Sequence, residues 1–185
     1  MLKTVHDFAG RLSPFLNDYH YQPALTEELD AVGPEPFDQA RINEIVLWKV
    51  NRYAPLSTAA LNAINHVAGL RNGEHHKPAK ELLVLLEQPG VDLPMASTFL
   101  RFRNSRTFQI IDGHAYRALF GKPYPFRPSS RDHKAKVDTY LAYLDALVAL
   151  AKAENMPFET MDRVLYCLDR AENPPLSART SKRRT

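Results

Sequence analysis

Cysteine is almost absent from this chain, and its scarcity limits the chemistry that the chain can host. Cys167 is the single cysteine among 185 residues. One thiol cannot form an internal disulfide, and it cannot supply a four-cysteine zinc site or an iron–sulfur cluster. Cys167 stands on the apolar face expected for the last helix, and we interpret it as a core residue.

Long apolar runs are also lacking. No stretch approaches the roughly 20 apolar residues that a membrane-spanning helix requires. The first ten residues carry His6 and Asp7 and have no long apolar core, so they do not resemble a signal peptide. We therefore expect a cytoplasmic protein that does not enter a membrane.

Glycine is scarce, and strict alternation of apolar and polar residues is almost absent. Both features disfavour strands. Apolar residues recur instead at spacings of three and four, most clearly between 131 and 152. Hydrophobic residues make up 44% of the chain and charged residues 24%, which is the balance of a globular protein rather than a disordered one. The sequence predicts an all-α protein.

Prolines and capping residues divide the chain into predicted helices. We expect helices near 36–53, 58–69, 78–88, 94–102, 113–120, 131–152 and 159–171. The expected organisation is an N-terminal segment, 1–34, packed on a single helical domain, 35–172, and followed by a basic, flexible tail, 173–185. The net charge of +3 permits nucleic-acid binding without requiring it.

A short turn separates two of the predicted helices. Residues 89–93 read Pro-Gly-Val-Asp-Leu, which leaves room only for a tight hairpin between helices. The amides of such a hairpin, beside the N-terminus of the next helix, favour an anion such as a DNA phosphate. Gly90 and Val91 are therefore candidate DNA contacts, and Arg101 and Arg103 add positive charge. A Pro-Gly-Val segment more commonly forms a simple turn between two helices, without a role in binding.

An aspartate follows the hairpin at the end of an apolar stretch. Gln109-Ile110-Ile111 precedes Asp112, and a helix is predicted from the next residue. A carboxylate at a helix N-terminus stays ionised more easily and suits the stabilisation of a cationic sugar during N-glycosidic cleavage. Taken alone, Asp112 fits an ordinary helix cap better than a catalytic residue. Its order and spacing after the hairpin favour the catalytic interpretation.

The two motifs together resemble those of the helix-hairpin-helix DNA glycosylase superfamily, which includes endonuclease III and the adenine and 8-oxoguanine glycosylases. The family's Leu-Pro-Gly-Val-Gly hairpin is similar to the segment 89–91, and its Val-Asp-x-His-Val-x-Arg motif matches at Asp112, His114 and Arg117. The resemblance implies an orthogonal helical bundle, binding of duplex DNA and a catalytic role for Asp112. We add Arg117 to the candidate DNA contacts.

The first long predicted helix shows a weaker resemblance to the adenine glycosylase helix that reads Ser-Glu-Val-Met-Leu-Gln-Gln-Thr. It implies that Glu44 donates a proton to the leaving base and that Trp48 lies beside the base. A solvated helix residue for Glu44 and core packing for Trp48 are the alternatives. The other candidates for lining the pocket or filling the gap in the duplex are Lys49, Asn51 and Arg52.

The chain departs from the family at several points. Asp92 replaces the second glycine of the hairpin, which puts a negative charge near the phosphate. Pro94 replaces the lysine of the bifunctional members, so that position offers no Schiff-base nucleophile. The iron–sulfur cysteines are absent. The resemblance therefore implies a monofunctional enzyme of base excision that uses water and no cofactor or metal.

Three other functions stay open. The chain could be a non-catalytic helix-hairpin-helix module that binds nucleic acid, an N-glycosidase of the same fold that acts on nucleosides or nucleotides, or a helical interaction protein. A metal site is the weakest candidate. No carboxylate or cysteine pattern joins His66, His75 and His76 in the sequence, so we interpret them as part of a solvated loop.

Overall fold

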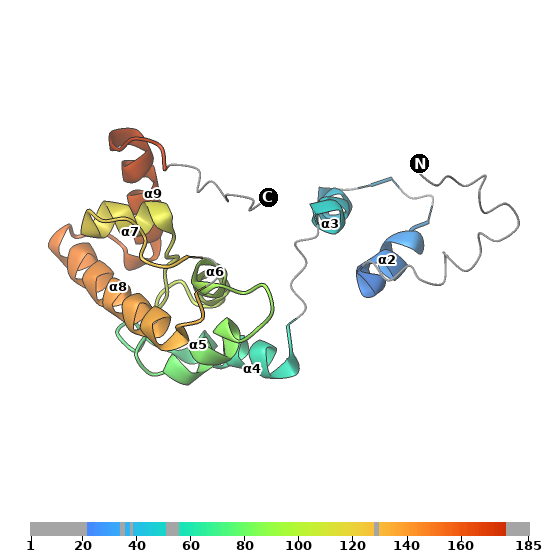
Figure 1. The fold of residues 1–185 in the computed structure, drawn as a ribbon, viewed down its shortest axis with the longest axis horizontal. Helices are drawn as coiled ribbons and strands as arrows, with labels where there is room; N and C mark the ends of the chain where they lie inside the picture. The colour runs from blue at the N-terminus through green and yellow to red at the C-terminus, as the bar shows by residue number, and fades with distance from the viewer. Residues whose placement is uncertain (1–21, 34–35, 38, 51–55, 128–129, 177–185) are drawn as a thin grey trace, which may run out of the picture. The chain divides into compact units, whose positions relative to one another are not determined.

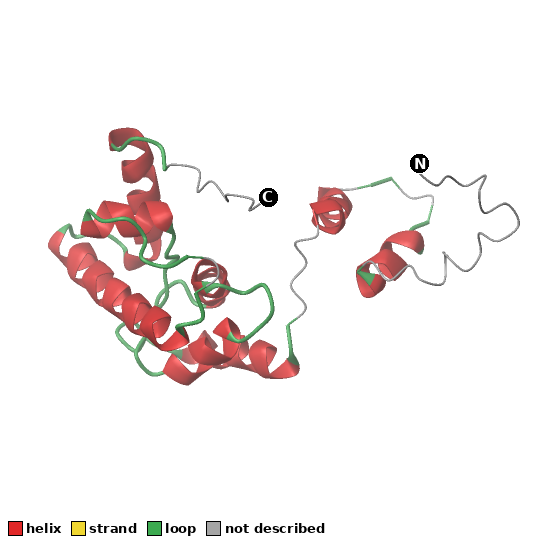
Figure 2. Cartoon of the chain, viewed as in Figure 1, coloured by secondary structure: helices red, strands yellow, loops and turns green. Residues whose placement is uncertain are grey.

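The computed structural model describes residues 22–33, 36–37, 39–50, 56–127 and 130–176. Within these ranges the regular structure consists of α-helices and two short 3-10 helices, without a strand (Figure 2). This confirms the predicted all-α class. No helix in the described ranges is long and apolar enough to cross a membrane.

The chain divides into two compact units between Ala54 and Pro55. The sequence pattern instead predicts a boundary between 34 and 35. The helix that begins at Gln39 therefore groups with the N-terminal segment and not with the main helical unit. Of the predicted basic tail, residues 177–185 lie outside the described part of the chain.

The first unit contains α2 (Pro23–Asp30) and α3 (Gln39–Val50), which pack on each other. Leu25 is its buried apolar residue on α2. The Trp48 indole N–H donates to Thr26 Oγ1 at 2.9 Å, and the Gln22 side-chain amide donates to the Trp48 carbonyl at 3.1 Å. These bonds tie the end of α3 to the start of α2.

The second unit contains the remaining elements (Figure 1). They are α4 (Thr58–His66), η2 (Val67–Gly69), α5 (Ala79–Leu86), α6 (Leu93–Arg103), α7 (Gly113–Phe120), α8 (His133–Ala153), η3 (Phe158–Thr160) and α9 (Met161–Glu172). Helices α4, α5 and α6 pack on one another, α8 packs on α5, and α7 packs on α9. The predicted helices match these elements to within a few residues.

Helix α8 supplies the largest part of the core. Val137, Tyr140, Leu144 and Leu147 recur at spacings of three and four and are all buried. Each such side chain contributes about 1.5–3 kcal/mol to folding when it is removed from water. The periodicity that the sequence shows in this region is therefore the signal of a buried helix face.

Aspartate and serine side chains begin several of these helices. Ser57 accepts from the Ala60 amide at 3.2 Å, Asp112 from Ala115 at 2.7 Å and Asp132 from Ala135 at 3.0 Å. Each bond satisfies an amide that has no partner within its helix. Ser57 and Asp112 are both N-caps, which is the alternative that the sequence left open for Asp112 and does not test its catalytic role.

The sequence interpretation of Cys167 as a core residue is wrong. Cys167 is exposed, and the neighbouring Leu168 is 45% exposed. The buried stripe instead joins Met161, Leu165 and the carboxylate of Asp169. A buried charge in that stripe shifts the face that packs on α7, and a count of apolar residues cannot detect it.

Candidate functional site

Asp112 caps α7 and lies half-buried at the end of an immobilised segment. Its Oδ1 accepts the Ala115 amide, whereas Oδ2 receives no hydrogen bond from any described residue. The helix N-terminus favours the negative charge of the carboxylate. One carboxylate oxygen is thus structural, and the second is available to a ligand.

Buried hydrogen bonds hold the residues that lead to Asp112. The Tyr140 hydroxyl donates to the Gln109 carbonyl at 2.8 Å, and the Tyr143 hydroxyl donates to the Ile110 carbonyl at 2.7 Å. The Ile111 amide donates to Ser97 Oγ at 3.2 Å. Three bonds to α8 and α6 therefore hold the residues that lead to the aspartate.

Burial keeps both tyrosines in their protonated form. It raises the pKa of Tyr140 and the pKa of Tyr143 well above their usual value, and the nearby Asp162 carboxylate adds to each effect. A protonated phenol is the form that donates to a carbonyl. The support for Asp112 therefore does not change across the physiological pH range.

Asp112 lines a cavity of about 460 Å³ between the start of α7 and α9. The apolar part of the wall comes from Ile110, Ala115 and Cys167. Tyr166 and Arg163, both exposed on α9, complete it on the side toward solvent. An aromatic ring and a guanidinium beside an apolar wall suit a flat ring that carries a phosphate-linked sugar.

The sequence interpretation missed Tyr166 and Arg163. Both lie on α9, about 50 residues beyond Asp112, where no motif marked them. The fourth polar residue of the wall, Asp162, is already engaged. Its carboxylate accepts the Ile110 and Arg163 amides at 3.3 and 2.7 Å and faces Arg101 at 3.4 Å.

The hairpin lies between α5 and α6, as predicted. Gly90 has φ +76°, a left-handed conformation that glycine adopts without strain. The Val91 side chain is buried, and its amide donates to the Gln88 carbonyl at 3.1 Å. Val91 therefore anchors the turn instead of offering its amide to a phosphate. The amides of Gly90 and Asp92 have no acceptor among the described residues.

The charge of Asp92 is paired. Its carboxylate caps α6 by accepting the Leu93 amide at 2.7 Å, and it lies 2.7 Å from Nζ of the buried Lys136. Lys136 also donates to the Ser130 carbonyl at 2.6 Å. The unfavourable charge that the sequence places at the hairpin is thus neutralised by a lysine on α8.

A cavity of about 760 Å³ lies against the hairpin. Its far side is formed by the start of α8, where Arg131 is exposed and His133 is half-buried, and Glu87 adds a negative charge at the hairpin end. This cavity and the one at Asp112 share no lining residue. The hairpin and the aspartate therefore belong to two separate recesses of the second unit.

Two of the arginines predicted to contact DNA already have partners within the protein. Arg101 is buried, faces Asp162 and donates to the Glu159 carbonyl at 3.2 Å. Arg117 donates to both carboxylate oxygens of Asp169 at 2.7 Å. Both guanidiniums have acceptors within the second unit, and a role for either in binding a DNA phosphate stays a prediction. Arg103 is exposed at the end of α6 and keeps that assignment as a prediction.

The arginine and histidine of the second motif meet at one carboxylate. Asp169 is fully buried and also contacts His114 Nδ1 at 2.7 Å and the Asn173 side-chain amide at 2.8 Å. The hydrogen bonds from Arg117 hold the pKa of Asp169 well below its usual range. Burial opposes this shift, and the bonds from His114 and Asn173 add to it. These contacts fasten α7 to α9.

The candidates in the first unit have local partners. Glu44 pairs with Arg41 at 2.6 Å within α3, and Arg41 also faces Glu28 at 3.7 Å. The half-buried Trp48 donates its indole N–H to Thr26 on α2, and its role beside a base stays a prediction. The side chain of Lys49 and the residues Asn51 and Arg52 lie outside the described part. Glu44 and Asp112 belong to different units, so the catalytic role of Glu44 stays a prediction.

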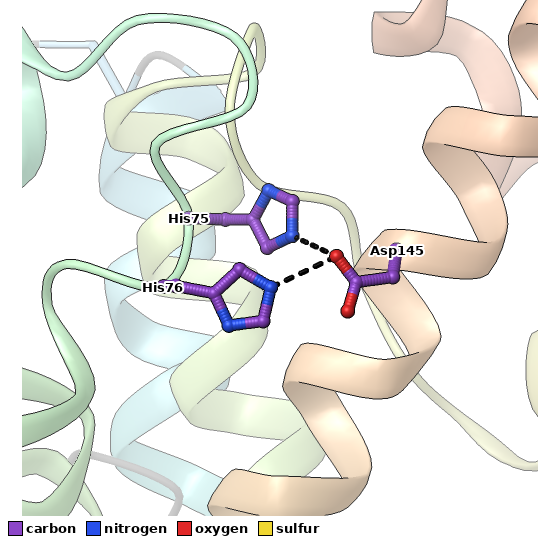
Figure 3. Close-up of side chains that lie close together, drawn as sticks. All are labelled: His75, His76 and Asp145. Atoms are coloured by element: carbon purple, nitrogen blue, oxygen red, sulfur yellow. Dashed lines mark hydrogen bonds and ion pairs between the residues drawn. The ribbon is translucent and has the colours of Figure 1, made fainter.

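The histidine interpretation needs a correction. His75 Nε2 and His76 Nε2 each lie 2.8 Å from the same oxygen of Asp145 on α8 (Figure 3). The sequence interpretation found no carboxylate for these histidines because the aspartate lies about 70 residues away. His66 is not part of this group and pairs with Glu81 at 2.6 Å.

Comparison with protein-family models, with curated proteins and with solved structures finds no match to this chain.

Proposed function

We propose that the chain binds duplex DNA and is a monofunctional DNA N-glycosylase-like enzyme that hydrolyses the N-glycosidic bond of a base rotated out of the duplex. The observation that carries the proposal is the carboxylate of Asp112, which lines a cavity of about 460 Å³ together with Tyr166 and Arg163. Ligand pockets in proteins span roughly 300–1,000 Å³, so a nucleobase and its sugar have room there.

The chemistry that we propose follows from charge. The bond between C1′ and the base nitrogen breaks, and its electron pair leaves with the base, which takes up a proton. The ionised Asp112 stabilises the positive charge that develops on the sugar. Water forms the new bond to C1′ and gives up a proton.

The hairpin supports the DNA-binding part of the proposal. The amides of Gly90 and Asp92 lie beside the N-terminus of α6, and Arg131 is exposed on the facing side of the same recess. Backbone amides, a helix N-terminus and an arginine are the groups that hold DNA phosphates in register.

A non-catalytic nucleic-acid-binding module is the second candidate. It is favoured by the bond from the Ala115 amide to Asp112 Oδ1, since that bond gives the aspartate a structural role without catalysis. In this case the hairpin binds DNA and the Asp112 cavity does no chemistry.

The variant Asp112→Asn separates these two functions. Asparagine caps helices about as well as aspartate, so the fold is retained. We expect base excision to be lost by at least about 100-fold, while DNA binding is kept or tightened because a negative charge is removed. Asp132→Asn, at another capping aspartate, is the matched control. The assay uses duplexes that each carry one damaged or modified base and scores alkali-labile abasic sites.

Three results would contradict the enzymatic proposal. Excision that is undiminished in Asp112→Asn would leave the aspartate as a cap. An absence of excision across the panel, with DNA binding intact, would select the non-catalytic module. A covalent adduct trapped by borohydride would reveal an amine nucleophile, which is not expected because Pro94 occupies the lysine position.

A further inference from the structure

Three side chains that the proposed function does not use lie close together in the second unit. They are His75 and His76, from the loop before α5, and Asp145, from the middle of α8 (Figure 3). One ligand atom from each lies within 4.8 Å of the other two. Two imidazoles that converge on one carboxylate oxygen form a donor set of two nitrogens and one oxygen.

Hydrogen bonds around Glu74 hold the loop that carries the two histidines. The Arg71 amide donates to the Glu74 carboxylate at 2.9 Å, and the Lys77 amide donates to the Glu74 carbonyl at 3.0 Å. Lys77 also pairs with the Glu74 side chain at 2.6 Å. This turn presents the two consecutive histidines toward α8, with their ring centroids 4.5 Å apart.

Only one nitrogen of His75 is available to a ligand. The residue is 3% exposed, and its Nδ1 is buried without a partner among the described residues. Its Nε2 faces Asp145. The side chains of His76 and Asp145 are each 55% exposed, so they can adjust their positions. His75 is therefore the fixed member of the group, and the other two are adjustable.

We propose that His75, His76 and Asp145 bind a divalent first-row cation of the zinc class. Imidazole nitrogen with carboxylate oxygen suits zinc, whereas magnesium and calcium prefer oxygen ligands alone. Ligand bonds of about 2.0–2.2 Å in a tetrahedron place neighbouring ligand atoms about 3.3–3.6 Å apart. The present N···O distances of 2.8 Å need to open by about 0.5–0.8 Å to reach that range.

The remaining coordination position faces solvent, because two of the three ligands are exposed. Three protein ligands with one open position distinguish this site from the closed, four-ligand sites that only stabilise a fold. A cation here would also fasten the loop before α5 to α8. This proposal runs against the expectation from the sequence that the chain binds no metal, and it does not depend on the glycosylase proposal.

The test uses the full chain without an affinity tag, after removal of metals with a chelator. Calorimetric titration with zinc chloride should give one cation per chain, and the melting temperature should rise with zinc concentration. Cobalt chloride should give the visible absorption of a low-symmetry site. Asp145→Asn and His76→Gln, both at exposed positions, should each weaken zinc binding at least about tenfold.

His66→Gln is the matched control, since its imidazole also faces a single carboxylate but has no second histidine beside it. It should leave zinc affinity unchanged. Asp145→Glu, which keeps a carboxylate, should restore part of the binding lost in Asp145→Asn. An absence of stoichiometric zinc binding overturns the proposal, and so does binding that is equal in the wild-type chain and in both Asp145→Asn and His76→Gln.

Discussion

Among single residues, Asp169 makes the most contacts with the residues of the predicted motifs. It is the shared acceptor for Arg117, His114 and Asn173, and it is fully buried. Two of the motif residues that resemble the glycosylase family are therefore occupied with holding α7 on α9. The motif match identified His114 and Arg117, but their shared contact with Asp169 is visible only in the structure.

We predict that Asp169→Asn lowers the free energy of unfolding by about 2–3 kcal/mol, because it removes charge-assisted bonds and leaves the Arg117 charge without its partner. Urea unfolding followed by circular dichroism measures the change. Asp138→Asn, which breaks the exposed pair with Lys134 at 2.8 Å, is the control and should cost less than about 0.5 kcal/mol. Equal costs for the two variants would show that Asp169 is not a stabilising centre.

The pH dependence of stability provides a second check of the same carboxylate. The pKa of Asp169 is lower in the folded state than its usual value of 3.8, so its contribution is fully present above that value. It is lost as the pH falls below 3.8 through the lowered pKa of the folded state. Asp169→Asn should therefore flatten the fall in stability below about pH 4. If stability falls equally in the wild-type chain and in Asp169→Asn as the pH is lowered below about 4, Asp169 is not the source of the pH dependence.

Charges at the hairpin recess give a prediction for DNA binding. Arg131→Gln should weaken binding to an undamaged duplex about two- to fivefold, because it removes one exposed cation. Glu87→Gln should strengthen binding by a similar factor, since it removes the anion on the opposite side of the recess. Fluorescence anisotropy at fixed salt measures both. If the two variants change the affinity for DNA in the same direction, the DNA does not bind at the hairpin recess.

At the scale of elements, turns and caps were predictable because their signals are local. Pro89 and Gly90 indicate the turn, and Ser57 and Asp112 indicate where two helices begin. The partners of these elements were not predictable. Tyr166 reaches the Asp112 cavity from α9, and Asp145 reaches His75 from α8, across 70 residues in the second case. Pairing over such separations depends on packing, which a single sequence does not display.

The hairpin gives the prediction at this scale. Gly90→Ala should cost about 1–2 kcal/mol of stability because alanine is strained at φ +76°. It should also weaken DNA binding by distorting the amides of the turn. Gly73, at φ +85° in the loop before α5, is the matched control. Neither glycine has an atom within 4 Å of an added Cβ, so both variants test strain alone.

Comparing the two glycine variants separates the hypotheses. Gly73→Ala should lose similar stability in thermal melts and keep its affinity for DNA. If both variants lose affinity equally, general destabilisation explains the effect and the hairpin has no specific role in binding.

At the scale of the whole molecule, the division of the chain was the least predictable feature. The apolar pattern of α3 resembles that of a core helix, yet α3 belongs to the unit that ends at Ala54. Its Ile42 and Val46 side chains are 42% and 52% exposed. Helical periodicity identifies a face that can be buried, but it does not say which part of the chain covers that face.

Salt dependence tests the proposed partner at this scale. Binding of duplex DNA should weaken steeply as salt rises, with a slope of about −2 to −3 in a plot of log affinity against log salt if two to three phosphates are neutralised. An N-glycosidase for free nucleosides should show almost no slope. Titrations at several sodium chloride concentrations decide between them, and a flat response with a duplex would exclude phosphate contacts at the hairpin.

The attachment of α7 to α9 also has a consequence for the order in which the chain is made. Arg117 and Asp169 are 52 residues apart, and α8 is translated between them. At about 5–20 residues per second, a ribosome needs roughly 3–10 seconds to cover that interval. Throughout that time Arg117 on the nascent α7 lacks the carboxylate of Asp169. The cavity that contains Asp112 is lined in part by α9, so it forms only after α8 has been translated.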